Sequence, residues 1–264
     1  MRPGTEEYKQ KRSRTRMPTR QEDWICFENV TVRYGELKAL DDFSLRIRRG
    51  EFLTLIGRSG CGKTTALRLI NGLNMPDEGR VTVRGEDVAH TDLIGLRRSI
   101  GYAIQDVGLF PHMTVRDNIS YVPRIAGLWK KRDAAAQVAP LLVLVGLDPA
   151  LMKRYPNELS GGQRQRVGIA RALAAKPEIL LMDEPFGAVD EITRRTLQTE
   201  IKRLHKELEL TIVFVTHDIR EAMLLGDRML VMDAGHVIQL DTPEAIRRAP
   251  AAPFVAELLS GTQR

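Results

Sequence analysis

Apolar residues in this chain follow two patterns that alternate along most of its length. Short β-prone runs at 25–34, 43–47 and 81–83 predict half-buried strands. Continuous apolar runs, typical of strands buried on both faces, occur at 52–56, 179–182, 212–215 and 229–232. Apolar residues also recur at helical spacing at Ala66, Leu69, Ile70 and Leu73, and at Leu197, Ile201, Leu204 and Leu208. This alternation predicts an α/β fold with a parallel sheet covered on both faces.

The segment from about residue 106 to 165 has a different pattern. It shows no convincing strand, and we expect prolines to separate its helical pieces: Pro111, Pro123, Pro140, Pro149 and Pro156. We therefore predict an inserted helical subdomain. The longest apolar run, 138–147, is interrupted by Pro140 and Gly146 and is far below the ~18 apolar residues of a membrane-spanning helix.

Composition is that of a folded globular protein, with 43% hydrophobic and 28% charged residues among 264. The net charge is +6, but residues 1–23 carry seven Lys or Arg against four Asp or Glu, which is half of that excess. We expect this basic segment to be a disordered tail before one domain at 24–264, and we expect no nucleic acid partner. Two cysteines and no apolar leader segment favour a reducing, cytoplasmic setting.

The strongest chemical signal is a glycine-rich loop between a predicted buried strand and a predicted helix. It fits the phosphate-binding pattern G-x-x-x-x-G-K-[ST] and predicts nucleotide binding through Gly57, Arg58, Ser59, Gly60, Cys61, Gly62, Lys63, Thr64 and the following Thr65. Glycines let backbone amides converge on phosphates, Lys63 adds a positive charge, and Thr64 offers a hydroxyl to Mg²⁺.

Two adjacent carboxylates end the apolar strand at 179–182. At the carboxyl edge of a parallel sheet, Asp183 would reach the Mg²⁺ ion and Glu184 would face the attacking water. An acidic turn before Pro185 would explain these two residues alone, but together with Lys63 and Thr64 they indicate an ATPase or GTPase.

A third motif, Leu159-Ser160-Gly161-Gly162-Gln163, selects the family. Ser160 and Gln163 have capping-box spacing at the start of a predicted helix, whose first amides could bind an anion. With these motifs the chain resembles the ATP-binding cassette family over residues 24–260. The resemblance implies a P-loop NTPase (RecA-like) core with an N-terminal antiparallel β-subdomain and an inserted helical subdomain. It also implies ATP hydrolysis in a homodimer, where this pentapeptide of one subunit covers the γ-phosphate held by the other.

The same resemblance assigns roles to four more residues. Tyr34 is similar to the aromatic residue that stacks on adenine, and Gln105 to the glutamine that joins the Mg²⁺ and water network to the membrane partner. His217 resembles the histidine that contacts the γ-phosphate, and Asp190 the aspartate that signals across the dimer. The chain departs from the pattern at Arg58, where proline is frequent, and at Asp106 and Val189.

Segments 108–115, 154–158 and 183–188 look like those of importer ATPases for quaternary amines such as glycine betaine, choline and carnitine. The implied partners are a second copy, integral-membrane permease subunits and, indirectly, a solute-binding protein, with the chain at the cytoplasmic face of the membrane. The 109–111 region would form part of an apolar groove for a permease helix. A lipid or amino-acid transport system, or a soluble ATPase of this family acting on ribosomes or nucleic acid, stays open as an alternative.

Cys61 precedes a predicted helix start and lies two residues before Lys63. Both features favour a thiolate, so we expect a lowered pKa and inactivation by alkylation, with Cys26 reacting more slowly. The alternative is a small buried residue that fills a tight loop and is inert.

Overall fold

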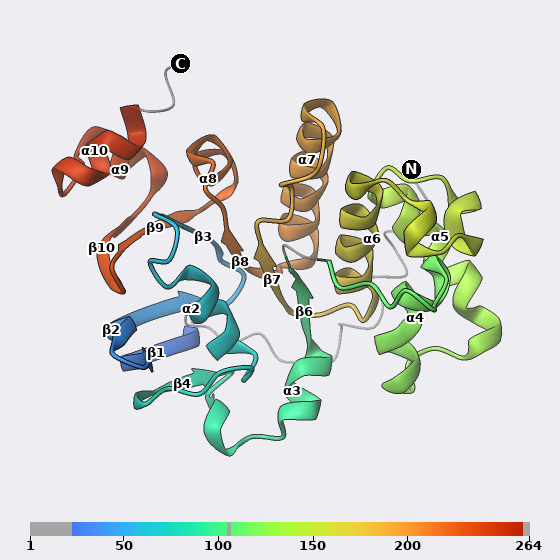
Figure 1. Ribbon diagram of the computed structural model, residues 1–264, viewed down its shortest axis with the longest axis horizontal. Coiled ribbons are helices and arrows are strands. Elements are labelled where there is room, and N and C mark those ends of the chain that lie inside the picture. Colours follow the sequence, from blue (N-terminus) through green and yellow to red (C-terminus); the bar gives the residue numbers. More distant parts are fainter. Residues whose placement is uncertain (1–22, 105–106, 261–264) are drawn as a thin grey trace.

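The computed structural model describes residues 23–104 and 107–260, so the predicted tail lies outside the described residues except for Asp23. The centre of the molecule is a six-stranded sheet in the order β10-β9-β3-β8-β7-β6 (Figure 1). Its strands are β3 (Phe52–Gly57), β6 (Ile100–Ala103), β7 (Ile179–Asp183), β8 (Thr211–Val215), β9 (Arg228–Asp233) and β10 (His236–Asp241). All four strands predicted from continuous apolar runs are confirmed, and β3, β7 and β8 are buried at nearly every position.

Two strands of this sheet were not predicted. The four-residue β6 pairs in parallel with β7, and β10 pairs antiparallel with β9, so the sheet is mixed rather than wholly parallel. Neither strand has an unbroken apolar run. Gly101 interrupts β6, and Gln239 interrupts β10, which is only partly buried. Both lie at the edges of the sheet, where one flank of a strand has no neighbour and the hydrophobic signal is weaker.

A second, antiparallel sheet has the order β2-β1-β4-β5. It consists of β1 (Asp23–Tyr34), β2 (Leu37–Arg48), β4 (Glu78–Val83) and β5 (Glu86–Asp87). Buried and exposed positions alternate in β2, as expected for a sheet with one face on the core. Helix α2 (Lys63–Ile70) contacts strands of both sheets. It ends before Leu73, which is half-exposed, because Gly72 takes a left-handed conformation with φ of 64°.

Residues 107–178, between β6 and β7, fold into helices and loops. Their α-helices are α4 (Val115–Ile125), α5 (Ala134–Leu144) and α6 (Gly161–Ala174), with α3 (Leu93–Ser99) preceding β6. The expectation that every proline separates helical pieces is wrong at two positions, since Pro123 lies inside α4 and Pro140 inside α5. Both helices have eleven residues, and their buried apolar faces offset the lost main-chain hydrogen bond.

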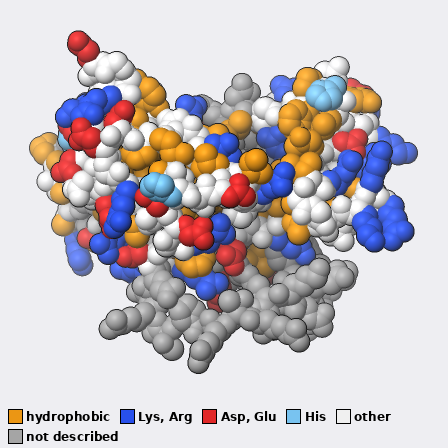
Figure 2. Space-filling model, turned by 90° about the horizontal axis from the view of Figure 1, so that it is seen from below, with side chains coloured by type: hydrophobic (Ala, Val, Ile, Leu, Met, Phe, Trp, Pro, Cys, Tyr) orange, Lys and Arg blue, Asp and Glu red, His pale blue; other side chains and the backbone are white. Residues whose placement is uncertain are grey.

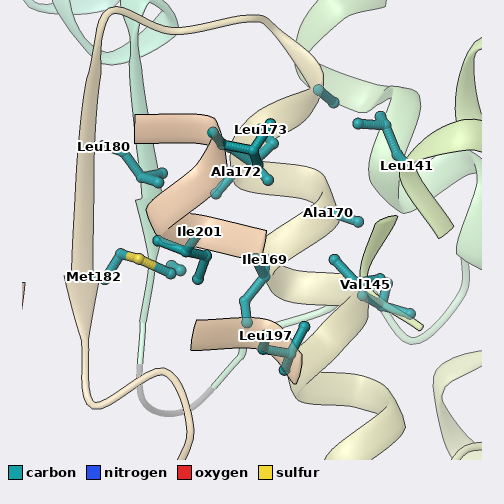
Figure 3. Close-up of a cluster of buried hydrophobic side chains, with 14 of the residues drawn as sticks. Leu141, Val145, Ile169, Ala170, Ala172, Leu173, Leu180, Met182, Leu197 and Ile201 are labelled. Atoms are coloured by element: carbon teal, nitrogen blue, oxygen red, sulfur yellow. The ribbon is translucent and has the colours of Figure 1, made fainter. Parts of the chain in front are cut away.

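Helices α7 (Glu191–Leu208) and α8 (Ile219–Leu225) cover the same face of the large sheet as α6, whereas α2 and the antiparallel sheet pack on the opposite face. Helices α9 (Pro243–Arg248) and α10 (Pro253–Ser260) follow (Figure 1). Figure 3 shows Leu180 and Met182 of β7 meeting Ile169 and Leu173 of α6 and Ile201 of α7. The four apolar positions that predicted the helix at 197–208 are all buried. One continuous core thus joins the sheet to the helices between β6 and β7 and places the start of α6 beside the end of β7.

Candidate phosphate-binding and hydrolysis site

The glycine-rich loop joins β3 to α2 and depends on two glycines. A Cβ on Gly57 would lie 2.2 Å from the Met232 carbonyl oxygen and 2.8 Å from the Cys61 sulfur. A Cβ on Gly62, where φ is 101°, would lie 2.4 Å from the Ala39 carbonyl oxygen. Because main-chain oxygens cannot give way, only glycine allows the loop to pack this closely against the neighbouring segments.

Lys63, the first residue of α2, turns its side chain back under the loop. Its Nζ donates to the carbonyl oxygens of Gly57 at 2.8 Å and Arg58 at 2.9 Å, and the residue is only 8% exposed. The loop therefore encloses a fixed positive charge beside the first amides of a helix, an arrangement that attracts phosphate. Arg58, Ser59 and Gly60 form the exposed tip of the loop, and Thr65 is half-buried in α2.

Thr64 and Asp183 meet although 118 residues separate them in the sequence. Burial, together with the nearby Glu184 charge, raises the pKa of Asp183 above its ordinary value, although hydrogen bonding with Thr64 and the charges of Arg68 and Lys63 act to lower it. A hydroxyl and a carboxylate in contact are a donor set that suits Mg²⁺, which commonly takes one or two protein ligands and completes its shell with phosphates and water. Within the described residues no three His, Cys, Asp or Glu side chains form a separate metal cluster.

Glu184 and His217 are also brought together. His217 Nδ1 lies 3.2 Å from Glu184 Oε2, and His217 is far more exposed than its partner, at 71% against 23% for the side chains. Glu184 has φ of 46°, a left-handed conformation that is uncommon for a residue with a side chain. Its amide donates to the carbonyl oxygen of Val215 at 2.9 Å, which fixes this turn to the end of β8.

The predicted capping box at the start of α6 is confirmed. The Gln163 amide donates to Ser160 Oγ at 3.2 Å, and the Ser160 amide donates to Gln163 Oε1 at 2.9 Å. Gly161 and Gly162 face Ala188, and a Cβ on Gly162 would come within 2.9 Å of the Ala188 carbonyl oxygen. In Figure 1, the edge strand β6 lies between α2 and α6.

Three predicted site residues remain: Asp190, Tyr34 and Gln105. Asp190 caps α7, and the hydrogen bond from the Thr193 amide, at 3.0 Å, lowers the pKa of the Asp190 carboxyl. Tyr34 ends β1 with half of its surface exposed, and its hydroxyl accepts a hydrogen bond from Asn74. Gln105 lies outside the described residues.

Arg58 reaches away from the loop toward the C-terminal helix. Its guanidinium lies 4.6 Å from the Phe254 ring centroid and 3.7 Å from the Glu257 carboxylate. These residues and His217 line a pocket of about 500 Å³. A proline at position 58 could make neither contact. The arginine found there in place of the frequent proline therefore links the loop to α10.

A buried carboxylate that sequence reasoning missed supports the His217 loop. Thr216 Oγ1 donates to Glu221 Oε2 at 2.6 Å and accepts from the Asp218 amide at 3.0 Å. Gln198 Nε2 donates to Glu221 Oε1 at 3.2 Å, and burial raises the pKa of Glu221. The available signal was an acidic residue four positions after His217 in a short apolar helix, which is too common a pattern to single out.

The expected reactive thiolate at Cys61 is contradicted. Cys61 is 3% exposed, and burial raises the pKa of its thiol although Lys63 Nζ lies 3.7 Å from the sulfur. The loss of solvent around the sulfur outweighs the nearby positive charge. Cys61 is therefore the small buried residue that fills the loop beneath Gly57.

Comparison with known proteins agrees with this arrangement. The ABC transporter family profile matches residues 40–187. The choline transport ATP-binding protein OpuBA of Bacillus subtilis is 50% identical over 236 residues, which are 89% of this chain and 62% of the relative. The glycine betaine uptake system ATP-binding protein YehX of Escherichia coli is 45% identical over 239 residues, covering 90% of this chain and 77% of the relative. A dimeric ATP-binding cassette in a post-hydrolysis state, bound to ADP and Pi, superimposes with a TM-score of 0.77 at 33% identity and covers 83% of this chain and 98% of that one.

The fold and the site thus define a nucleotide-binding cassette, an α/β protein with a glycine-rich loop, an acidic strand end and a capped signature helix. The chain belongs to the ABC transporter family. It spans about three fifths of the length of the Bacillus subtilis relative.

The burial of Cys61 predicts the order in which the two cysteines react. Cys26 is partly exposed and Cys61 is buried, so native protein treated with iodoacetamide should be alkylated first at Cys26. Cys61 should react only after denaturant is added, because its thiol pKa is raised and reagent cannot reach the sulfur. Peptide mass spectrometry over time gives both rates. Faster reaction at Cys61 would restore the thiolate interpretation.

The raised pKa of Asp183 predicts that its charge costs stability in the nucleotide-free protein. Asp183→Asn should therefore raise the thermal midpoint at pH values above the raised pKa of Asp183. This gain should disappear as the pH falls through the raised pKa toward the ordinary value of 3.8, because protonation then removes the same charge.

The same variant should be stabilised less by Mg-ATP, because a carboxylate ligand is lost. Exposed Asp133→Asn is the matched control and should change neither midpoint. A lower nucleotide-free midpoint for Asp183→Asn at neutral pH would contradict the prediction.

Proposed function

We propose that this chain is the ATP-hydrolysing subunit of a membrane importer for a quaternary amine osmoprotectant. The observation that carries the ATPase part is the contact of 3.2 Å between Glu184 and His217, beside the Thr64–Asp183 pair. These side chains come from the carboxyl ends of β7 and β8 and the start of α2, so one nucleotide could touch all of them.

In the proposed reaction, ATP and water give ADP and phosphate. The loop amides and Lys63 bind the phosphates, and Tyr34 stacks on adenine. Thr64 and Asp183, with Gln105, would hold Mg²⁺, which neutralises charge on the phosphates when it is bound. Glu184 orients the attacking water and takes its proton, while His217 contacts the γ-phosphate and fixes the carboxylate. The left-handed main chain at Glu184 directs its side chain to this position.

A second copy of the chain would complete each site. The first amides of α6, at Ser160 to Gln163, would cover the γ-phosphate held by the loop of the partner. The separation of α6 from α2 within one chain supports this, as does the dimeric cassette to which the chain is similar. Asp190, exposed at the start of α7 near Gly162 and Ala188, is then placed to contact the partner.

The helical subdomain offers a surface for the permease. A groove of about 610 Å³ along α4 is lined by aromatic, aliphatic and basic side chains and one carboxylate: His112, Met113, Arg116, Asp117, Tyr121, Arg124, Ile125, Trp129 and Lys131. Phe110 packs on Tyr121 with ring centroids 5.0 Å apart and so braces one wall. Figure 2 shows Lys and Arg side chains gathered at this end of the molecule. An amphipathic permease helix fits such a groove.

The names of the similar proteins support the remaining parts of the proposal. OpuBA is named for choline transport and YehX for glycine betaine uptake. The structure describes no helix long and apolar enough to cross a bilayer, so the proposed attachment is through the permease at the cytoplasmic face. A separate solute-binding protein would deliver the solute to the permease.

Glu184→Gln should separate nucleotide binding from hydrolysis. The amide keeps the size of the side chain but cannot take a proton, so turnover should fall ~100-fold or more while ATP still binds. Trapped ATP should then hold two chains together, which size-exclusion chromatography with and without Mg-ATP would detect. Lys63→Ala should instead weaken binding itself. A variant that binds ATP yet stays monomeric at micromolar concentration would contradict the shared site.

The solute is best tested in the whole transporter. With its cognate permease and binding protein in lipid vesicles, ATP turnover should rise when choline, glycine betaine or carnitine is added. Amino acids and lipids are the controls, because they represent the alternative transport systems. Stimulation by a control solute alone would overturn the quaternary amine assignment and leave the ATPase assignment intact.

A further inference from the structure

Gln165 lies one turn into the signature helix α6 and is 4% exposed. Its side chain uses both polar atoms on the segment that follows Asp183. Nε2 donates to the Glu184 carbonyl oxygen at 3.1 Å, and Oε1 accepts from the Ala188 amide at 2.8 Å. One amide group therefore bridges the two ends of the segment 184–188.

The main chain at Glu184 is held from two directions. Its amide donates to the Val215 carbonyl oxygen in β8, and its carbonyl oxygen accepts from Gln165 in α6. With φ of 46°, this residue lies outside the broad favoured regions and needs its surroundings to hold it there. Hydrogen bonds on both sides supply that constraint, and the direction of the Glu184 carboxylate toward His217 follows from it.

We propose that Gln165 is a positioning residue for hydrolysis, which orients Glu184 through its main chain without touching the nucleotide. This rests on the proposed function, in which Glu184 acts on the attacking water. Gly162, on the same helix, also packs directly on Ala188. In the proposed dimer, Gln165 thus fastens the signature motif that covers one nucleotide to the Glu184 that acts on the other.

Gln165→Met tests the role with a side chain of similar length that makes neither hydrogen bond. We expect kcat for ATP hydrolysis to fall about 10- to 100-fold, because small displacements of a catalytic group have effects of this size. KM for ATP should change less than about threefold, since the contacts of Lys63 and the loop are untouched. An unchanged kcat would overturn the proposal.

Gln165→Glu separates the two hydrogen bonds. An ionised carboxylate can still accept from the Ala188 amide but cannot donate to the Glu184 carbonyl oxygen. We expect kcat to fall as it does in Gln165→Met. Near-normal turnover would show that only the Ala188 bond matters, and the proposed positioning of Glu184 would be wrong.

Gln239→Met is the matched control. Gln239 makes the same pair of bonds far from Glu184, donating to the Ala249 carbonyl oxygen at 2.9 Å and accepting from the Ala251 amide at 2.8 Å. Its kcat should equal that of the unmodified protein. Equal losses of kcat in Gln239→Met and Gln165→Met would mark a general effect on folding and overturn the positioning role.

A double-mutant cycle with Glu184→Gln distinguishes positioning from a structural role. If Gln165 acts through Glu184, adding Gln165→Met to Glu184→Gln should lower the residual turnover by less than about twofold. A further loss as large as that of the single variant would overturn the proposal. Failure of the proposed function would look different, because Glu184→Gln alone would then retain its turnover.

Discussion

Main-chain hydrogen bonds on both sides of β8 set the geometry on which the rest of the molecule depends. Val215 pairs with Leu55 of β3 on one side and with Asp183 of β7 on the other. Strands β7 and β8 therefore end at the same level and β3 ends two residues further on, so the residues that follow them emerge at one edge of the sheet. A shift of one residue in either pairing would turn Asp183 to the opposite face of the sheet and separate it from Thr64.

Several charges are buried around this edge, and each has polar partners. Lys63 has two carbonyl oxygens, Asp183 has Thr64, and Glu221 has Thr216 and Gln198. Burying an ionised group is costly unless hydrogen bonds replace its water. Burial raises the pKa values of Asp183 and Glu221, which indicates that this replacement is incomplete and that the ionised forms of these two carboxyls lower the stability of the fold.

The links around Glu184 join segments that are distant in the sequence. The end of β8 holds its amide, α6 holds its carbonyl oxygen through Gln165, and His217 holds its carboxylate. Since Gly162 and Gln165 both contact Ala188, the start of α6 and the segment 184–188 form one packed unit. A rotation of the helical region against the sheet would therefore act on the main chain of Glu184 as well as on the signature motif.

Local patterns in the sequence determined the buried strands, the glycine loop, the acidic strand end and the capping box at Ser160. Each of these follows from hydrophobic period or residue chemistry within a few positions, and each is confirmed. The weakly apolar edge strands β6 and β10 escaped that reasoning because they have no unbroken apolar run.

Only the tertiary structure decided what surrounds each group. It buried Cys61 and so reversed the expected pKa, directed Arg58 to Phe254, and brought Gln165 and Glu221 to the loops of Glu184 and His217. Loss of solvent and contacts between segments far apart in the sequence depend on packing, which local patterns do not contain.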